Sequence, residues 1–328
     1  MRKQIQVYLE TVTPLRTGGA YQVRRGIRSS SLLGSLRFWF ETICYAGGLV
    51  GKKDFDKGRG QFTAPWSGED LKSLILENGS AEREIIKILL EKRISLPDII
   101  FGTTGWQGRI FISEIKIIKV LKNPFTSSFL RQSGIHSSDD FFWGKCAINF
   151  ATDDFIAESI LYPLLAFMDR YGFWGSKWNL GWGRLQVLDI KERGGELLLW
   201  EEGENQFRFS FWGGKDKKFT DLVEKVTSFE DLTSWESGNC RIKALEKGLQ
   251  KKRIEEILKA LIEEKKQKRC VFAREEGEEE KAKMHQVFGT VEKPPPDAPH
   301  GSKILPWVYR KGDKYQTGFI SITSLLNL

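Results

Sequence analysis

A change of hydrophobic period near the N-terminus is the feature that most constrains how this chain folds. Residues 4–10 alternate apolar and polar side chains, as a half-buried strand does. Residues 16–30 are polar, basic and glycine-containing, and apolar side chains then recur at helical spacing from Leu32 to Ile43. The sequence therefore predicts a strand, a basic loop and a helix in that order, with the loop leading directly into the helix N-terminus.

Strand and helix periods also follow one another through the rest of the chain. In the first half we expect helices within residues 69–92, an end to that helical region at Pro97, a strand over 110–120, an exposed loop over 127–140, a helix over 155–171 and a strand over 185–190. After a linker over 191–195, we expect the two arms of a hairpin (196–200 and 206–212), a helix over 244–266, and strands over 302–310 and 315–322.

Positive charge is concentrated in the basic loop and its surroundings. The 328 residues carry a net charge of +8. Residues 1–40 hold seven basic side chains and one acidic one, whereas residues 191–328 hold 26 basic and 24 acidic side chains. The sequence therefore predicts that a polyanionic partner contacts the first half of the chain.

The residues before the first long helix are suited to binding phosphate. Glycines let the backbone approach a phosphate oxygen, helix N–H groups and hydroxyls donate to it, and arginine offers two parallel donors. The alternative is a solvated loop whose charges keep the protein soluble. The candidate binding residues here are Arg16, Gly18, Gly19, Arg24, Arg25, Arg28, Ser31 and Arg37.

A second glycine-rich segment, residues 172–184, mixes tryptophans with cations. Its four glycines argue against a helix, so the tryptophans are not a simple core stripe. Such a loop suits single-stranded RNA, in which splayed bases stack on aromatic rings and cations follow the backbone. The alternative is that the rings pack under a sheet, and we expect at least one tryptophan to do so. The candidate RNA-binding residues are Lys177, Trp178, Trp182 and Arg184. We expect Lys177 and Arg184 to be spatial neighbours of the candidate residues before the first long helix and of Arg37, and to form with them one basic surface that holds RNA by its backbone.

Few patterns point to catalysis. None of the three histidines lies in the first 130 residues, and there is no serine or cysteine triad pattern, zinc-protease motif or phosphate-binding P-loop. Asp139-Asp140 and Asp153-Asp154 offer carboxylates to a magnesium ion, but such pairs usually are solvated or cap helices. The four cysteines form no C-x-x-C pair. We therefore expect that the protein is not an enzyme and that it has no catalytic residue, no metal site and no cofactor.

Four segments resemble the RAMP superfamily of CRISPR proteins, and within it the family of first subunits of the Cmr (type III-B) RNA-silencing complex. Residues 13–19 are similar to an opening T-P-L-x-x-G-G loop, Phe101-Gly102 to an F-G turn, and residues 175–184 to a glycine-rich loop. The most specific segment is residues 27–39, which resembles I-R-x-x-S-I-x-G-x-L-R-F-W. The resemblance covers about residues 1–190 well.

The resemblance implies an α+β fold of tandem ferredoxin-like (RRM-like) domains. The N-terminal domain, with the basic and glycine-rich loops, spans residues 1–192, and the C-terminal domain spans residues 193–328. A repeat of Phe101-Gly102-Thr103 as Phe288-Gly289-Thr290 also hints at duplication.

The implied function is that of a non-catalytic subunit. It would contact the 3′ region of guide RNA (crRNA), target RNA, or both, and would help to assemble the complex for antiviral RNA silencing. Its partners would be these RNAs and the other Cmr subunits. Because no apolar run reaches the length of a signal peptide or membrane span, we expect a cytoplasmic protein with no membrane partner.

Two other functions remain open from the sequence. A guide-RNA-processing RAMP endoribonuclease would need an acid or base near the first glycine loop, where Tyr21 or a lysine would have to serve because no histidine is present. An architectural subunit would contact proteins and barely touch RNA.

Overall fold

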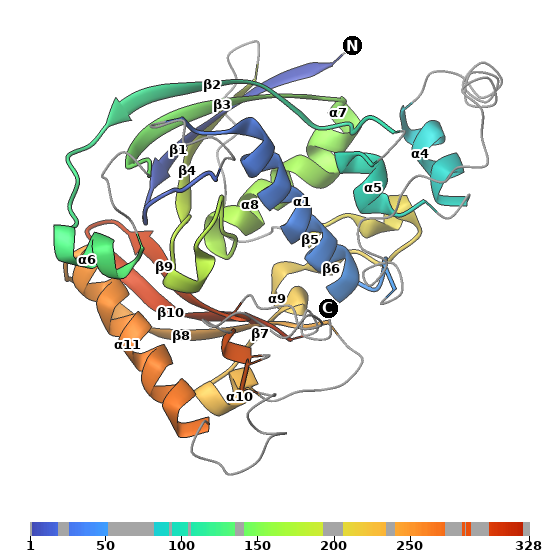
Figure 1. Ribbon diagram of the computed structural model, residues 1–328. Coiled ribbons are helices and arrows are strands. Elements are labelled where there is room, and N and C mark those ends of the chain that lie inside the picture. Colours follow the sequence, from blue (N-terminus) through green and yellow to red (C-terminus); the bar gives the residue numbers. More distant parts are fainter. Residues whose placement is uncertain are drawn as a thin grey trace.

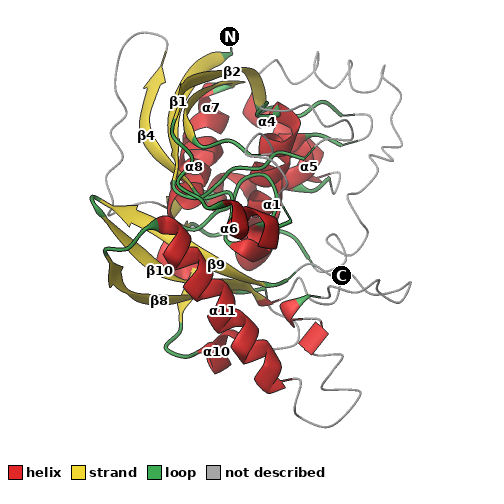
Figure 2. Ribbon diagram, turned by 60° about the vertical axis from the view of Figure 1, so that its left-hand side comes forward, coloured by secondary structure: helices red, strands yellow, loops and turns green. Residues whose placement is uncertain are grey.

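The computed structural model describes residues 2–18, 26–51, 82–91, 94–103, 106–134, 141–192, 206–233, 240–272, 284–285, 287–289 and 302–323. Within these ranges the protein has an α+β fold with two four-stranded sheets. Figure 2 shows the first sheet and its helices above the second sheet, which α11 accompanies. None of the described helices combines the length and apolarity that a bilayer span requires.

The first sheet is antiparallel and has the order β2-β3-β1-β4 (Figure 1). Its strands are β1 (Lys3–Thr11), β2 (Phe111–Val120), β3 (Gly144–Thr152) and β4 (Leu185–Glu192). In the central strand, Val7 lies opposite Ile148 on one side and Ile190 on the other. The predicted alternation of β1 is confirmed, since Ile5, Val7 and Leu9 are buried while the residues between them are partly exposed.

Helices cover one face of this sheet. The main ones are α1 (Ser29–Ala46) and a continuous helical segment made of α7 (Asp154–Ile156), a π-helical part (Ala157–Leu161) and α8 (Tyr162–Arg170). Both predicted helices are therefore confirmed. Shorter helices are α4 (Glu82–Glu91), α5 (Leu96–Phe101) and α6 (Ser127–Gln132).

Two sequence predictions for the first half are wrong. Pro97 does not end a helical region but lies in the first turn of α5, where its missing N–H costs nothing and the Ser95 side chain caps the helix. The stretch 127–140 is not wholly a loop, because Thr126 caps α6 and residues 127–132 are helical. Residues 135–140 of that stretch lie outside the described residues.

The second sheet has the order β7-β8-β10-β9. Its strands are β7 (Val223–Lys225), β8 (Ile242–Gln250), β9 (Ile304–Lys311) and β10 (Lys314–Ile322). β10 is antiparallel to both neighbours, whereas β7 and β8 are parallel. With α10 (Phe229–Thr233) and α11 (Ile254–Phe272), the element order is β-α-β-α-β-β, which differs from the β-α-β-β-α-β order of the main elements in the first half.

Two predictions for the second half also fail. The helix expected over 244–266 begins only at Ile254, because residues 242–250 pair with β7 and β10 as a central strand. Of the arm expected over 206–212, only β5 (Gln206–Phe207) is extended, and the 3-10 turn Phe209–Trp212 follows it. β5 pairs with β6 (Lys217–Lys218), which directly precedes α9 (Phe219–Leu222). The other arm and most of the proposed linker lie outside the described residues.

The two sheets share their hydrophobic cores. Trp307 and Ile320 of the second sheet belong to the cluster that contains Val7 and Phe40. Conversely, Trp182 from the glycine loop packs in the cluster of Leu258 and Leu261 on α11. The glycine loop is therefore held by packing against elements of both halves of the chain.

Candidate nucleic-acid interface

The two loops singled out in the sequence lie side by side. The backbone N–H of Ser176 donates to the carbonyl oxygen of Arg16 at 2.8 Å, and the N–H of Gly183 donates to that of Pro14 at 2.7 Å. The Ser176 hydroxyl also donates to the Arg16 carbonyl at 3.1 Å. The prediction that these stretches, some 160 residues apart, are spatial neighbours is confirmed.

The start of α1 is tied to the same place. The Thr17 hydroxyl donates to the Gly26 carbonyl at 2.9 Å and accepts from the Arg28 N–H at 3.2 Å. The Gly175 N–H donates to the Ser35 hydroxyl on α1 at 2.9 Å. Residues 16–18, 26–31 and 175–179 thus form one continuous feature, called here the three-loop surface.

Close backbone approach explains the glycine in the second loop. Gly175 has a φ of +71°, and a Cβ atom there would collide with the carbonyl oxygen of Arg16. Lys177 also has a positive φ of 64°, which non-glycine residues adopt only at a cost. The left-handed backbone lets the Lys177 side chain reach Ser133, to whose carbonyl it donates at 2.9 Å.

Two cations lie close together on the three-loop surface. Burial, together with the positive charge of Arg16, lowers the pKa of Lys177 from its usual value. Among the described residues, neither Arg16 nor Lys177 forms an ion pair with a carboxylate. Like charges held together without a counter-charge are unfavourable unless an anion joins them.

The N-terminus of α1 adds to this positive potential. Arg28 occupies the N-cap position, makes no side-chain cap and is followed by no acid in the first turn. Ser29 and Ser30 are exposed. The first-turn N–H groups carry the positive end of the helix dipole, so the three-loop surface is suited to a phosphate group.

Arg184 does not belong to this surface, and the prediction that it does is wrong. Its side chain is only 1% exposed, and its guanidinium donates to backbone carbonyls of Met168 (3.1 Å), Arg170 (2.9 Å) and Gly172. It also donates to the Val308 carbonyl on β9 at 3.1 Å. Burial lowers the pKa of Arg184 to about 9. This arginine joins the end of α8 to the second sheet.

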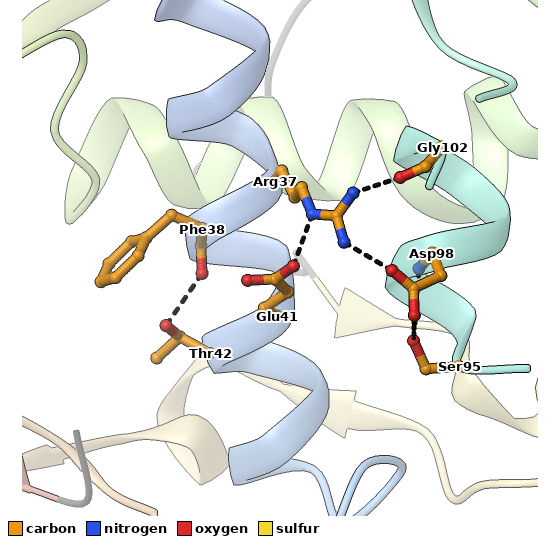
Figure 3. A network of polar contacts seen from close by, with 7 residues as sticks. All are labelled: Arg37, Phe38, Glu41, Thr42, Ser95, Asp98 and Gly102. Atoms are coloured by element: carbon orange, nitrogen blue, oxygen red, sulfur yellow. Dashed lines mark hydrogen bonds and ion pairs between the residues drawn. The ribbon is translucent and has the colours of Figure 1, made fainter. Parts of the chain in front are cut away.

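Arg37 is likewise structural, so its predicted place on the basic surface is wrong. Figure 3 shows its guanidinium between α1 and α5, with Glu41 at 2.6 Å, Asp98 at 2.5 Å and the Gly102 carbonyl as acceptors. Ser95 donates to the other Asp98 oxygen at 2.7 Å. The two carboxylates neutralise the arginine, and the Phe101-Gly102 turn supplies one of its acceptors.

The tryptophans divide between core and surface. Trp182 is fully buried and packs edge-on against Phe141 with ring centroids 5.6 Å apart, so the prediction that it contacts RNA is wrong. Trp178 is half-buried and packs against Phe38 at 5.0 Å and Trp39 at 6.1 Å. An RNA contact by Trp178 stays a prediction.

The remaining candidates fall into two groups. Gly19, Arg24 and Arg25 lie outside the described residues. The structure brings together Arg16, Gly18, Arg28, Ser31, Lys177 and Trp178. Sequence reasoning missed Thr17 and Ser176, whose hydroxyls hold the loops together; their position beside glycines in the basic loops was the only available signal.

The carboxylate pairs have other roles where they can be seen. Asp153 accepts from the Phe155 N–H at 2.9 Å as a helix cap, and Asp154 pairs with Lys3 at 3.4 Å. In the described ranges, no group of three or more His, Cys, Asp or Glu side chains is placed to hold a metal ion. Asp139, Asp140 and His136 lie outside those ranges.

The fold and the three-loop surface define an α+β protein with two sheets that presents paired cations at a helix N-terminus. Its sequence matches the family model of the RAMP superfamily over residues 8–186, which is more than half of the chain. The protein belongs to the RAMP superfamily. No protein with a curated description matches its sequence significantly.

Several solved structures are similar to it at low sequence identity. Cmr1 from Pyrococcus furiosus, in its apo crystal form, is 13% identical, with 98% of this chain and 88% of that chain covered and a TM-score of 0.48. A chain of the type III-B Cmr-beta complex bound to cognate target RNA and AMPPnP is 11% identical, with 99% and 96% covered and a TM-score of 0.49. Cmr6 from Pyrococcus furiosus is 17% identical over 56% and 97%, with a TM-score of 0.29.

Proposed function

We propose that this chain is a cytoplasmic, non-catalytic RNA-binding subunit of a type III-B Cmr effector complex. It holds the 3′ region of guide RNA, the target RNA, or both, and helps to assemble the complex with other Cmr subunits. Membership of the RAMP superfamily and the resemblance of residues 27–39 to first subunits support this proposal.

We also propose that the two halves are ferredoxin-like domains. The order β1-α1-β2-β3-α8-β4 and the sheet order β2-β3-β1-β4 support this for residues 1–192. In the second half, β8, α11, β9 and β10 follow the first four elements of the same pattern. β7 takes the place of the final edge strand, but precedes β8 in the chain and runs parallel to it. We regard this half as a rearranged ferredoxin-like domain.

The observation that carries the RNA proposal is the proximity of Arg16 and Lys177, whose loops are hydrogen-bonded to each other and to α1 or its N-cap. A phosphate there would receive donors from both side chains and from the helix, and would relieve their mutual repulsion. Such contacts hold the RNA backbone and do not distinguish bases. Sequence would then be selected by pairing between guide and target.

The test is a titration of the full chain with guide-length single-stranded RNA at several salt concentrations. Replacing both cations (R16Q/K177Q) should weaken binding and lower the slope of log affinity against log salt by about 0.7, since one phosphate contact is lost. The matched control is K116Q/K191Q, which removes two lysines that already pair with Glu114 and Asp189. Equal binding by the two double variants would contradict the assignment of the site.

The same purified chain can be used to test the two other functions, RNA cleavage and a purely architectural role. Incubation with repeat RNA that gives a discrete cleavage product would contradict the non-catalytic role. Absence of RNA binding, both by the isolated chain and in crosslinks from an assembled complex, would favour an architectural subunit.

A further inference from the structure

One face of α11 changes from apolar to cationic partway along the helix. Ile257, Leu258 and Leu261 are buried against the rest of the protein. At successive intervals of four residues after Leu261, the same stripe carries Lys265 and Arg269. The helix therefore continues its packed face as a pair of cations.

This cationic end of α11 meets the three-loop surface. The Lys265 ammonium donates to the carbonyl oxygen of Asn179 at 3.3 Å. Asn179 belongs to the 3-10 turn Trp178–Leu180, which Lys177 directly precedes. Further along the loop, Gly181 lies against Leu258 of α11. The second half of the chain thus places Lys265 at the turn that follows Lys177, with Arg269 one helical turn further along α11.

The pair differs from the other cations of α11 in having no acidic partner. Lys259, Lys266 and Lys268 pair with Glu255 (2.5 Å), Glu263 (3.9 Å) and Glu230 (2.9 Å). Within the described part of the chain, neither Lys265 nor Arg269 forms an ion pair with a carboxylate. Burial, together with the charge of Arg269, lowers the pKa of Lys265 to about 7.

Like charges four residues apart destabilise a helix, and burial adds to the cost. A bound anion would offset both effects. The Lys265 ammonium lies beside Asn179, which follows Lys177 by two residues. An anion bound by the three-loop surface is therefore the one within reach of this pair.

We propose that Lys265 and Arg269 bind a phosphate of the same RNA that the three-loop surface holds, so that its backbone passes over the Trp178–Leu180 turn onto α11. This proposal rests on the proposed function and extends it. The charge distribution of the sequence predicts RNA contacts in the first half of the chain, whereas α11 belongs to the second half. Arginine offers a two-pronged donor to the phosphate, and lysine adds a point charge.

The test compares two double variants of the full chain in the same RNA titration. K265Q/R269Q should bind about fivefold more weakly near 0.1 M salt and show a salt slope smaller by about 0.7, as expected for one lost phosphate contact. The control K266Q/K268Q removes the same charge from the same turns of α11, but at lysines that already have carboxylate partners. It should bind nearly as well as the wild type. Circular dichroism confirms that each variant is folded.

The outcomes separate the two proposals. If wild-type RNA binding is weakened by R16Q/K177Q while K265Q/R269Q behaves like its control, the role of α11 is overturned and the proposed function survives. If the wild-type chain binds no RNA, both are overturned. A loss confined to K265Q/R269Q relative to its control supports the proposal.

Discussion

The N–H of Gly175 donates a hydrogen bond of 2.9 Å to the hydroxyl of Ser35, a residue of α1 that lies 140 positions earlier in the chain. This contact holds the second glycine loop against the helix whose N-terminus the three-loop surface uses. The arrangement depends on a backbone conformation that a side chain at position 175 would disturb.

Replacing Gly175 with alanine should therefore weaken both stability and RNA binding. The positive φ and the collision with the Arg16 carbonyl predict a loss of about 2 kcal/mol in the free energy of unfolding. Urea denaturation measures the first effect and RNA titration the second. The control is G18A, because a Cβ atom at position 18 would have open space around it and alanine should be tolerated there. Equal stability of the two variants would contradict the close approach.

Arg184 should prove essential for stability. R184M leaves several buried carbonyls without their donor and should lower the free energy of unfolding by at least about 3 kcal/mol. R184K should rescue it only partly, because an ammonium lacks the arginine fork. Urea denaturation provides the measurement, with R131Q as the control, since Arg131 is exposed and its side chain donates to the Ser127 carbonyl of its own helix turn. An R184M protein of wild-type stability with reduced RNA affinity would contradict this role.

The Arg37–Asp98 pair should stabilise the contact between α1 and α5. We expect R37Q and D98N each to cost about 2 kcal/mol, because both side chains are mostly buried: R37Q leaves Asp98 without its arginine, and D98N leaves Arg37 with Glu41 as its one remaining carboxylate partner among the described residues. The double variant should cost less than the sum of the two, which a double-mutant cycle from urea curves measures. Strict additivity would show that the pair contributes nothing.

Stability should increase with pH because of Lys265. Its pKa is about 7 in the folded protein, against 10.5 ordinarily, so between these values the unfolded chain binds more protons than the folded one. The contribution of Lys265 to the free energy of unfolding should therefore rise above pH 7, by about 1.4 kcal/mol per pH unit at most, while the full cost of its desolvated charge is present below pH 7.

The variant K265M isolates this contribution. It should be more stable than the wild type near pH 7 and lose the rise up to about pH 9, whereas K266M should keep it. If the curves of unfolding free energy against pH are parallel for the wild type and K265M, the pKa of Lys265 is not lowered in the folded protein.

Local sequence patterns predict those parts of the fold that depend on local period. β1 and α1 are predicted because their apolar residues repeat along one face. β9 and β10 also lie where strands were predicted, although both are buried along most of their length. The segment 242–250 is wrongly predicted to begin a helix because its sheet partner, β10, lies about 70 residues further along. Pairing with a distant strand decides its structure.

The candidate site shows the same limit. Arg37 and Arg184 lie in basic, glycine-rich surroundings, as surface arginines would, but one acceptor of Arg37 is 61 residues away and one acceptor of Arg184 is 124 residues away. Burial of an arginine is decided by partners that local sequence does not reveal. The adjacency of the two loops was predictable because the resemblance to the family covered both segments. Lys265 and Arg269 on α11 lie outside the residues that the resemblance covers, so their position beside the second loop was not predicted.

The hydrogen bonds of Arg184 also bear on how the chain can be divided. Its donors are satisfied only when residues 168–172 and Val308 are both in place, and Trp307 likewise donates to the Arg170 carbonyl at 2.7 Å. A fragment that stops at residue 192 would lack the Val308 carbonyl and leave one Arg184 donor without its protein acceptor. The two halves of the chain should therefore depend on each other for folding, and either half expressed alone should be insoluble until the other is supplied in trans.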